Sequence, residues 1–554
     1  MSFYFEFPSI ERKSKTNFDC NKCTLKNNKI QSPEMQMYVG EQYEGLIILG
    51  NKASKHDDEK GFPFADSRSK ILRSTAAKFR INLSKQAAML HAVSCYNPTK
   101  KKTSDTHFKC CQSILDARLK ELRPKLIICC GELAFKYIFG LKNKYAISKL
   151  RNRIIPNYQY NCLVFPVYDP YNYEMYNTRK EEEELSYYYE HAYKWDLQRI
   201  FELWDKKFHK RTEVNKVLKE RKILENIEIK EVTDFHEAKE LFRLWNKSKA
   251  ICLDYETTNL FPYDNHFEIV YAAFGNKTNA WVFHEDFWKD NPFVKIWFKR
   301  QMQRILVNQK VLKVVQNSKF EDLCSRFVYG IKEIKNSFCT MLAQHVIDER
   351  EGCTSLDFQN LIRFGIPPYN ETIKKYLITD KKAKEIESDD SEDEMEEIIE
   401  LDEAKAYTFQ KVNKIREAPK QDMIQYNGLD VITAFNQWVL FEKDLLDSYP
   451  KARENYEFLN EGHWLFARMS QRGVNIGEQE LKDFELFLEK EIERIEKKIM
   501  EIPEIQEYNK HLESKSSKTK KKKNDKQLED LCFSKPKKIR LINRKFDFTE
   551  GEEK

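Results

Sequence analysis

The sequence predicts an α/β protein of several domains that ends in a helical segment. Its 554 residues exceed what one hydrophobic core usually organises, so about three or four domains are expected. Residues 15–175 and 226–445 alternate short apolar runs with helical stretches, which is typical of α/β domains. A third stretch indicates a long packed helix, because its apolar residues recur at steps of three and four. They are Leu481, Phe484, Leu488, Ile492, Ile495 and Ile499.

The first α/β unit is built around three apolar runs. Residues 46–50, 125–131 and 163–167 are nearly continuous in apolar side chains and each contains a Gly or a Pro, as buried parallel strands do. We therefore expect one domain over residues 1–177. The next stretch, residues 178–224, is rich in charged and aromatic residues and suits a solvated helical connector.

A second α/β domain is expected over residues 225–445. Its acidic stretch, residues 385–403, cannot bury apolar surface and is expected to form a disordered loop. Residues 446–503 are expected to be helical. The Lys-rich residues 504–554 are low in complexity and are expected to be poorly ordered.

Charge and apolar content exclude some classes of protein. Lys and Arg number 95 against 88 Asp and Glu, and the net charge of +7 favours a nucleic-acid partner only where basic residues cluster, as at 100–102 and 520–523. No apolar run reaches the roughly 18 to 20 residues of a membrane span, and the N-terminus lacks the pattern of a signal peptide. We expect a cytoplasmic protein that does not bind a membrane. The 13 cysteines are then expected to bind metal or to be buried rather than to form disulfides.

Two carboxylates close an apolar strand in the second α/β domain. Asp254 and Glu256 are two positions apart, so on a strand they point to the same face and can bind one hard metal ion together. One such pair is weak evidence among 88 acidic residues, and taken alone it is better explained as a solvated strand edge. The pair indicates a metal site only if further site residues follow in the chain.

Two later stretches supply companions. Glu321 follows Asn317 at an expected strand-to-helix turn, and Tyr426 and Asp430 share one face of a helix. Asn317 either caps its helix or contacts DNA. Tyr426 either takes part in the site or packs as an ordinary helix aromatic. Together the carboxylates make a candidate two-metal nuclease site.

In this order the three motifs resemble the DEDDy 3′-to-5′ exonuclease domain of DNA polymerase I-type (family A) enzymes. The resemblance covers residues 226–445 and implies an RNase H-like α/β fold that hydrolyses phosphodiester bonds at a DNA 3′ end with two Mg²⁺ or Mn²⁺ ions. It implies that Tyr426 orients the attacking water. Glu321 stands where an Asp is more usual, and its extra methylene moves the carboxylate out by about 1.5 Å. The direct metal ligands that the resemblance implies are Asp254, Glu256 and Asp430.

Four cysteines form a spaced set in the first domain. They are Cys20, Cys23, Cys95 and Cys111. The C-x2-C spacing of the first pair permits either zinc or an iron–sulfur cluster. Cys110 competes with Cys111 for the fourth place, whereas Cys129 and Cys130 fall within an expected strand and are assigned to the core.

Three further stretches accompany the cysteines. They are residues 61–64 (GFPF), 95–98 (CYNP) and 124–128 (PKLII). With the cysteines they resemble the iron–sulfur uracil-DNA glycosylases, over residues 15–175. The resemblance implies that the cysteines hold a [4Fe-4S] cluster, with Zn²⁺ as the alternative, and it favours Cys111 over Cys110. It also implies that Phe64 stacks on a flipped-out base.

Three positions depart from the pattern of that family. Residues 50–54 (GNKAS) lack the family's Glu and Pro, Asp169 replaces the His of its His-Pro motif, and His91 replaces an Asn. An Asp at that place repels the negative charge that develops on a leaving uracil. A binding or architectural domain is therefore favoured over an active glycosylase.

The segment after residue 450 contains the stretches 462–465 (GHWL) and 472–477 (RGVNIG). It resembles the start of the polymerase domain in family A enzymes, although an ordinary helical hairpin gives the same pattern. No palm motif follows, so the resemblance as a whole is to the front part of a bacteriophage-type polymerase, either a split gene product or a truncation. It implies proofreading on single-stranded DNA 3′ ends for a separate polymerase-domain polypeptide. The alternatives are a DNA-binding assembly subunit and a uracil-DNA glycosylase.

Overall fold

A computed structural model shows two β-sheets, each packed against helices, and a helical C-terminal segment. The described residues are 23–25, 37–65, 69–97, 105–141, 145–170, 183–263, 266–377, 413–473, 477–503 and 505–506. The chain divides into two compact units, one of residues 1–379 with 412–468 and one of residues 380–411 with 469–554. Both sheets belong to the first unit. Cys20, the acidic stretch 385–403 and nearly all of the tail 504–554 lie outside the described residues.

The first sheet has six strands in the order β1-β3-β2-β4-β6-β5. The central strands β3, β2, β4 and β6 are parallel, and the edge strands β1 and β5 are antiparallel to their neighbours. The strands are β1 (Tyr38–Val39), β2 (Leu46–Lys52), β3 (Ala87–Val93), β4 (Leu126–Cys130), β5 (Ile155–Asn157) and β6 (Cys162–Val167). The helices among them are α1 (Lys55–Lys60), α2 (Lys70–Lys78), α3 (Leu83–Gln86), α4 (Asp105–Leu122), α5 (Glu132–Phe139) and α6 (Ile147–Leu150).

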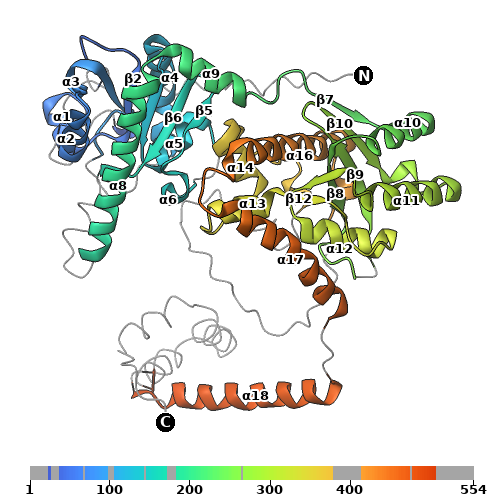
Figure 1. Ribbon diagram of the computed structural model, residues 1–554. Helices are drawn as coiled ribbons and strands as arrows, with labels where there is room; N and C mark the ends of the chain where they lie inside the picture. Colours follow the sequence, from blue (N-terminus) through green and yellow to red (C-terminus); the bar gives the residue numbers. More distant parts are fainter. Residues whose placement is uncertain are drawn as a thin grey trace. The chain divides into compact units, whose positions relative to one another are not determined.

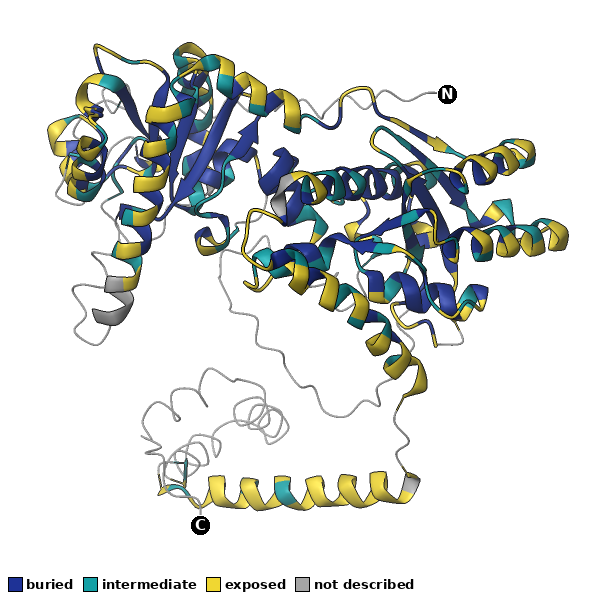
Figure 2. Cartoon of the chain, in the orientation of Figure 1, coloured by how far each residue is buried: buried dark blue, intermediate teal, exposed yellow. Residues whose placement is uncertain are grey.

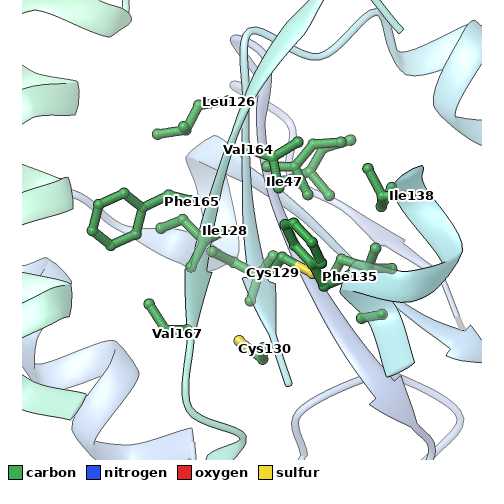
Figure 3. Close-up of a cluster of buried hydrophobic side chains, with 14 of the residues drawn as sticks. Ile47, Leu126, Ile128, Cys129, Cys130, Phe135, Ile138, Val164, Phe165 and Val167 are labelled. Carbon is green, nitrogen blue, oxygen red and sulfur yellow. The ribbon is translucent and has the colours of Figure 1, made fainter. Parts of the chain in front are cut away.

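Apolar side chains of this sheet form the first core. The three predicted apolar runs coincide with β2, β4 and β6, and every residue of β4 and β6 is buried. Figure 3 shows Cys129 and Cys130 among these side chains, together with Ile47 and Phe165. Their assignment to the core is therefore confirmed.

The charged segment 178–224 folds into helices that complete the first core. It contains α8 (Glu183–Leu203), the π-helical turn η6 (Trp204–Phe208) and α9 (Arg211–Arg221). The helices are as expected, but the segment is not a solvated connector. Its apolar side chains recur at helical spacing between the charged ones and pack against the first sheet. Those buried in this core include Tyr193, Leu197, Phe201, Trp204 and Phe208.

The second sheet also has six strands, in the order β12-β11-β8-β9-β10-β7. The central strand β8 is antiparallel to β9 and parallel to β11. The strands are β7 (Glu228–Glu231), β8 (Ala250–Thr257), β9 (Ile269–Gly275), β10 (Asn279–His284), β11 (Leu312–Val315) and β12 (Ser337–Cys339). The α-helices are α10 (Phe235–Trp245), α11 (Pro292–Leu306), α12 (Ser318–Tyr329), α13 (Thr340–Ile347), α14 (Leu356–Phe364) and α16 (Lys420–Leu440).

Helices cover both faces of this second sheet (Figure 1). On one face, α16 packs against a core that includes Cys252 of β8 and Val270 of β9. On the other face, α10 and α11 pack against Ile251 and Leu253 of the same strand. The strand β8 is therefore sandwiched between two apolar layers, and its alternate residues face α16.

Gly428 lets α16 lie close to the sheet. A Cβ at this position would meet Cγ2 of Ile229 in β7 at 2.4 Å, so no larger residue fits without a shift of the helix.

The helix α14 follows strands of the second sheet in the chain, but its Phe358 and Leu361 pack in the core of the first sheet. The described chain ends at residue 377 and resumes at residue 413, and the backbone N–H of Lys414 donates to the carbonyl of Tyr376 at 2.9 Å.

The C-terminal segment contains α17 (Ala452–Arg472) and α18 (Glu478–Met500). Tyr456 of α17 packs against Phe338 of β12, and its hydroxyl accepts from the backbone N–H of Cys339 at 3.0 Å. The predicted long helix is present as α18, but its apolar stripe is not packed. Leu481 and Ile492 are 54% and 55% exposed. Figure 2 shows α18 coloured as exposed along nearly its whole length. Among the described helices, none combines the length and apolarity needed to cross a membrane.

Candidate active site

Three predicted carboxylates meet where β8 faces α16. Asp254 and Glu256 leave the same side of β8 as Cys252, the side that α16 covers. Asp430 approaches from α16. One carboxylate oxygen from each of these three residues lies within 4.8 Å of the other two. Residues far apart in the sequence thus offer converging oxygen ligands, the kind that hard divalent cations prefer.

Two neutral side chains hold these carboxylates in place. Asn427 Nδ2 donates a hydrogen bond of 2.6 Å to Oδ2 of Asp254, and the hydroxyl of Tyr369 donates one of 2.5 Å to Oδ1 of Asp430. Neither donor carries a charge. The bonds therefore orient the carboxylates without neutralising them.

The cluster is electrostatically costly in the absence of a cation. Burial raises the pKa of Asp254 to about 7, against the hydrogen bond from Asn427, which lowers it. Burial also raises the pKa values of Glu256 and Asp430, and the neighbouring carboxylates raise them further. Among the described residues, no Lys or Arg lowers the pKa of Asp254 or Glu256. A divalent cation placed between the oxygens would relieve the repulsion.

Glu321 lies beside this group rather than in it. It sits in the first turn of α12 and is 2% exposed, and its Oε2 atom has no hydrogen-bond partner among the described residues. Burial raises its pKa first, and Asp254 and Glu256 raise it further, so the carboxylates are close. Its oxygens are nevertheless not among those within 4.8 Å. An orphaned buried oxygen next to three crowded carboxylates fits a site that takes a cation and its water.

The remaining predicted residues flank the carboxylates. Asn317 is the N-cap residue of α12, yet its side chain makes no capping hydrogen bond, so the capping alternative is not observed. Tyr426 packs partly into the core on α16. Burial raises the pKa of Tyr426, and Asp430 and Glu256 raise it further, so the ring packs and also faces the carboxylates.

Tyr369 and Asn427 were missed in the sequence. Asn427 lies between Tyr426 and Asp430 in the third motif, so its place on the carboxylate face of α16 could have been recognised from helical spacing. Tyr369 carries no such signal. It follows α14 in a loop, 61 residues before its partner Asp430.

In the first domain, Phe64 packs against His91. Phe64 is 6% exposed, and the ring centroids of the two residues are 4.8 Å apart. His91 Nε2 lies 3.0 Å from Oδ2 of Asp57. Burial opposes ionisation of Asp57, but the contact with His91 and the backbone N–H groups of Ser54 and Ala65 lower its pKa to about 2. The ring that was expected to stack on a base thus contacts a histidine held by an ionised carboxylate.

The other two departures from the glycosylase pattern are bonded to each other. Asn51 Nδ2 donates to Oδ2 of Asp169 at 2.7 Å, and Oδ1 of Asn51 accepts from the backbone N–H of Ala134 at 2.9 Å. The second bond satisfies a free N–H in the first turn of α5. Both side chains are therefore engaged in holding the fold.

The described cysteines of the predicted cluster lie against one core. Cys95 and Cys111 are each 6% exposed, and Cys23 packs partly buried against the same apolar cluster. The turn after Cys23 contacts the start of α4, which carries Cys111, because Thr24 Oγ1 lies 2.8 Å from Nε2 of His107. The fourth predicted ligand, Cys20, is outside the described residues.

Two protein-family models match the chain. Residues 38–192 match the uracil DNA glycosylase superfamily, and residues 229–445 match a 3′-5′ exonuclease family. A type-4 uracil-DNA glycosylase of Sulfurisphaera tokodaii is 23% identical over 166 residues, which are 29% of this chain and 74% of that protein. One of Archaeoglobus fulgidus is 23% identical over 155 residues, 27% of this chain and 76% of that protein.

Solved structures that resemble the chain include nucleases. Trypanosoma brucei RNase D in complex with RNA U12 is 14% identical, covers 45% of this chain and 72% of its own, and has a TM-score of 0.31. Escherichia coli RNase D is 13% identical, covers 43% of this chain and 50% of its own, and has a TM-score of 0.27. At these TM-scores the likeness carries no further argument. From the two family matches, the chain joins a domain of the uracil DNA glycosylase superfamily to a 3′-5′ exonuclease domain.

Proposed function

We propose that this chain is a metal-dependent exonuclease that removes nucleotides from the 3′ end of single-stranded DNA. We propose further that it proofreads for a polymerase polypeptide supplied separately. The observation that carries the nuclease proposal is the convergence of oxygens from Asp254, Glu256 and Asp430 within 4.8 Å of one another. The match of residues 229–445 to a 3′-5′ exonuclease family supports the direction of attack.

The donor set suits hard divalent cations, and we take these to be two Mg²⁺ or Mn²⁺ ions. All donors are carboxylate oxygens, and the orphaned Oε2 of Glu321 adds a further acceptor at the edge. When bound, such ions would stabilise negative charge on the attacking and leaving oxygens of a phosphodiester. The ligands in this proposal are Asp254, Glu256 and Asp430, with Glu321 next to them.

The chain's own residues would prepare the site. Asn427 orients one oxygen of Asp254, and Tyr369 orients one oxygen of Asp430. Tyr426, which faces the carboxylates from α16, would orient the attacking water. Asn317 at the start of α12 has a side chain without a capping bond, and it would contact the DNA strand.

Shortening of an end-labelled oligonucleotide tests this proposal. With Mg²⁺, the full chain should shorten single-stranded DNA from its 3′ end one nucleotide at a time, and EDTA should stop the reaction. Asp254→Ala should lose the activity, whereas the exposed control Asp290→Ala should keep it. Unchanged shortening by Asp254→Ala would refute the site. Equal rates on RNA would refute a preference for DNA, and failure to co-purify with any polymerase-domain polypeptide would argue against proofreading.

A second proposal concerns the first domain, which would bind DNA and a [4Fe-4S] cluster without removing uracil. The cluster ligands would be Cys20, Cys23, Cys95 and Cys111, with Zn²⁺ as the alternative metal. The hydrogen bond between Asn51 and Asp169 favours this over glycosylase activity, because both side chains are engaged with the fold. Broad visible absorbance of the purified chain would support iron–sulfur. A colourless protein that contains zinc would contradict the iron–sulfur cluster and support the alternative metal. Release of free uracil from uracil-containing DNA would contradict the absence of glycosylase activity.

A further inference from the structure

A hollow in the first domain is lined by cations and amides. Its volume is about 330 Å³, and no Asp or Glu is among its lining residues. It lies where β4 and β6 begin, since its lining residues Arg123 and Asn161 come three residues and one residue before these strands. Asn51 and His91 lie at the carboxyl ends of β2 and β3, which run parallel to β4 and β6. The hollow is therefore at the opposite edge of the sheet from Asn51 and His91. Its polar lining residues are Lys120, Arg123, Gln159, Tyr160, Asn161 and Arg211.

Arg211 is held across this hollow with its charge unneutralised. It is the first residue of α9, and its guanidinium donates to the carbonyl of Asn161 at 2.9 Å and to the carbonyl of Arg123 at 2.6 Å. Carbonyl acceptors orient a guanidinium but carry no negative charge. The positive charge of Arg211 therefore remains available beside Lys120 of α4 and Arg123, which follows that helix.

Two acidic residues of the same region, Glu121 and Asp116, are engaged elsewhere. Glu121, next to Lys120 on α4, accepts from Arg118 at 3.2 Å. Asp116 accepts from the hydroxyls of Tyr137 and Tyr160. Within the part of the chain that the structure describes, neither Lys120 nor Arg123 forms an ion pair.

Other exposed lysines of this domain do form ion pairs. Lys206 pairs with Glu202 at 2.5 Å, and Lys222 pairs with Glu225 at 2.5 Å. Around the hollow, three cations have no such partner among the described residues, and together they make it attractive to an anion.

We propose that this hollow binds a phosphate group. Guanidinium and ammonium groups, with an amide donor from Asn161, match the several acceptor oxygens of a phosphate. The phosphate can come from a nucleic-acid strand or from a free nucleotide. This site is separate from the carboxylate cluster on β8 and α16, so it goes beyond the proposed nuclease function and does not depend on it.

The first test measures binding of a labelled single-stranded oligonucleotide to the full chain by fluorescence anisotropy. EDTA is present throughout, so cleavage plays no part and a failure of the nuclease proposal does not affect the result. The variant Lys120→Ala with Arg123→Ala removes two cations. Its control is Lys78→Ala with Arg80→Ala, which removes the same charges from exposed positions in the same domain. Arg123 and Arg80 both have positive φ, at 47° and 60°, so the two variants place Ala in a similar backbone setting.

If the phosphate belongs to a strand, the logarithm of the binding constant should depend less steeply on the logarithm of salt concentration in the test variant. The expected decrease in slope is about 0.7, because the hollow takes one phosphate and each phosphate neutralised on a single strand contributes about 0.7 to the slope. The control variant should keep the slope of the wild-type chain.

The second test measures thermal stability in inorganic phosphate and in dATP, each at constant ionic strength. If the phosphate belongs to a free compound, one of these should raise the melting temperature of the wild type and of the control but not of the test variant. Either result supports the proposal and identifies the source of the phosphate. If the test and control variants behave alike in both measurements, the proposal is wrong. Arg211→Lys, which keeps the charge, should retain phosphate binding.

Discussion

Replacing Asp254 by Asn should stabilise the metal-free protein at pH 8. Burial raises the pKa of Asp254 from 3.8 to about 7, so ionising it in the folded state is costly. Each unit of pKa shift is worth about 1.4 kcal/mol, and the shift of about three units corresponds to roughly 4 kcal/mol. This value is an upper limit because Asp254 keeps some contact with solvent. The neutral amide avoids the cost and can still accept the hydrogen bond from Asn427.

The pH dependence has a definite sign. A carboxyl group whose pKa is raised on folding binds more protons in the folded state than in the unfolded state between pH 4 and pH 7. The folded state is therefore favoured at low pH, and stability is lost as the pH rises through this window. The wild-type chain should show this loss, and Asp254→Asn should show less of it.

Thermal unfolding in EDTA at pH 5 and pH 8 measures the difference. For a domain of this size, about 1 kcal/mol corresponds to roughly 2–4 °C, so a rise of several degrees is expected for Asp254→Asn at pH 8. Adding Mg²⁺ should reverse the order, because the ion stabilises the wild type by binding its folded state, by about 2.7 kcal/mol at a hundred times Kd. Asp290→Asn serves as the exposed control. The reasoning is refuted if Asp254→Asn is less stable than the wild type in EDTA at pH 8.

Three other substitutions have defined outcomes. Tyr369→Phe removes the hydrogen bond to Asp430 and should weaken Mn²⁺ binding about 10- to 100-fold in an isothermal titration, whereas Tyr376→Phe should not. Glu321→Gln should raise metal-free thermal stability, because burial and two carboxylates raise the pKa of Glu321; a lower melting temperature in EDTA would contradict this. Asp57→Asn should destabilise the first domain by about 2 kcal/mol at pH 7, since the pKa of Asp57 is lowered from 3.8 to about 2. That loss should shrink as the pH falls from 4 towards 2, and a difference that stays constant down to pH 2 would exclude ionisation as its cause.

Local patterns predicted the parts of this molecule that depend on local geometry. Asp254 and Glu256 share a face because strands alternate, and Tyr426 and Asp430 share one because helices repeat every 3.6 residues. The contact between Tyr369 and Asp430 depends on how the loop after α14 folds back. The sequence has no periodic pattern that predicts the path of this loop. The packing of α8 could have been found. Tyr193, Leu197 and Phe201 recur every four residues, but the average composition of residues 178–224 concealed this stripe.

The hydrogen bond between Lys414 and Tyr376 has a consequence for how the exonuclease domain tolerates change. It joins the two ends of the excursion that leaves after residue 377 and returns at residue 413. Beside it, the backbone N–H of Asn413 donates to the carbonyl of Thr258 at 2.6 Å, two residues past Glu256. The two ends are already adjacent, and the entropic cost of closing a loop grows only slowly with its length. The length of the segment between residues 377 and 413 therefore has little effect on that cost. This position is a natural insertion point, at which a segment can be shortened, lengthened or exchanged while β8 and α16 keep the same alignment.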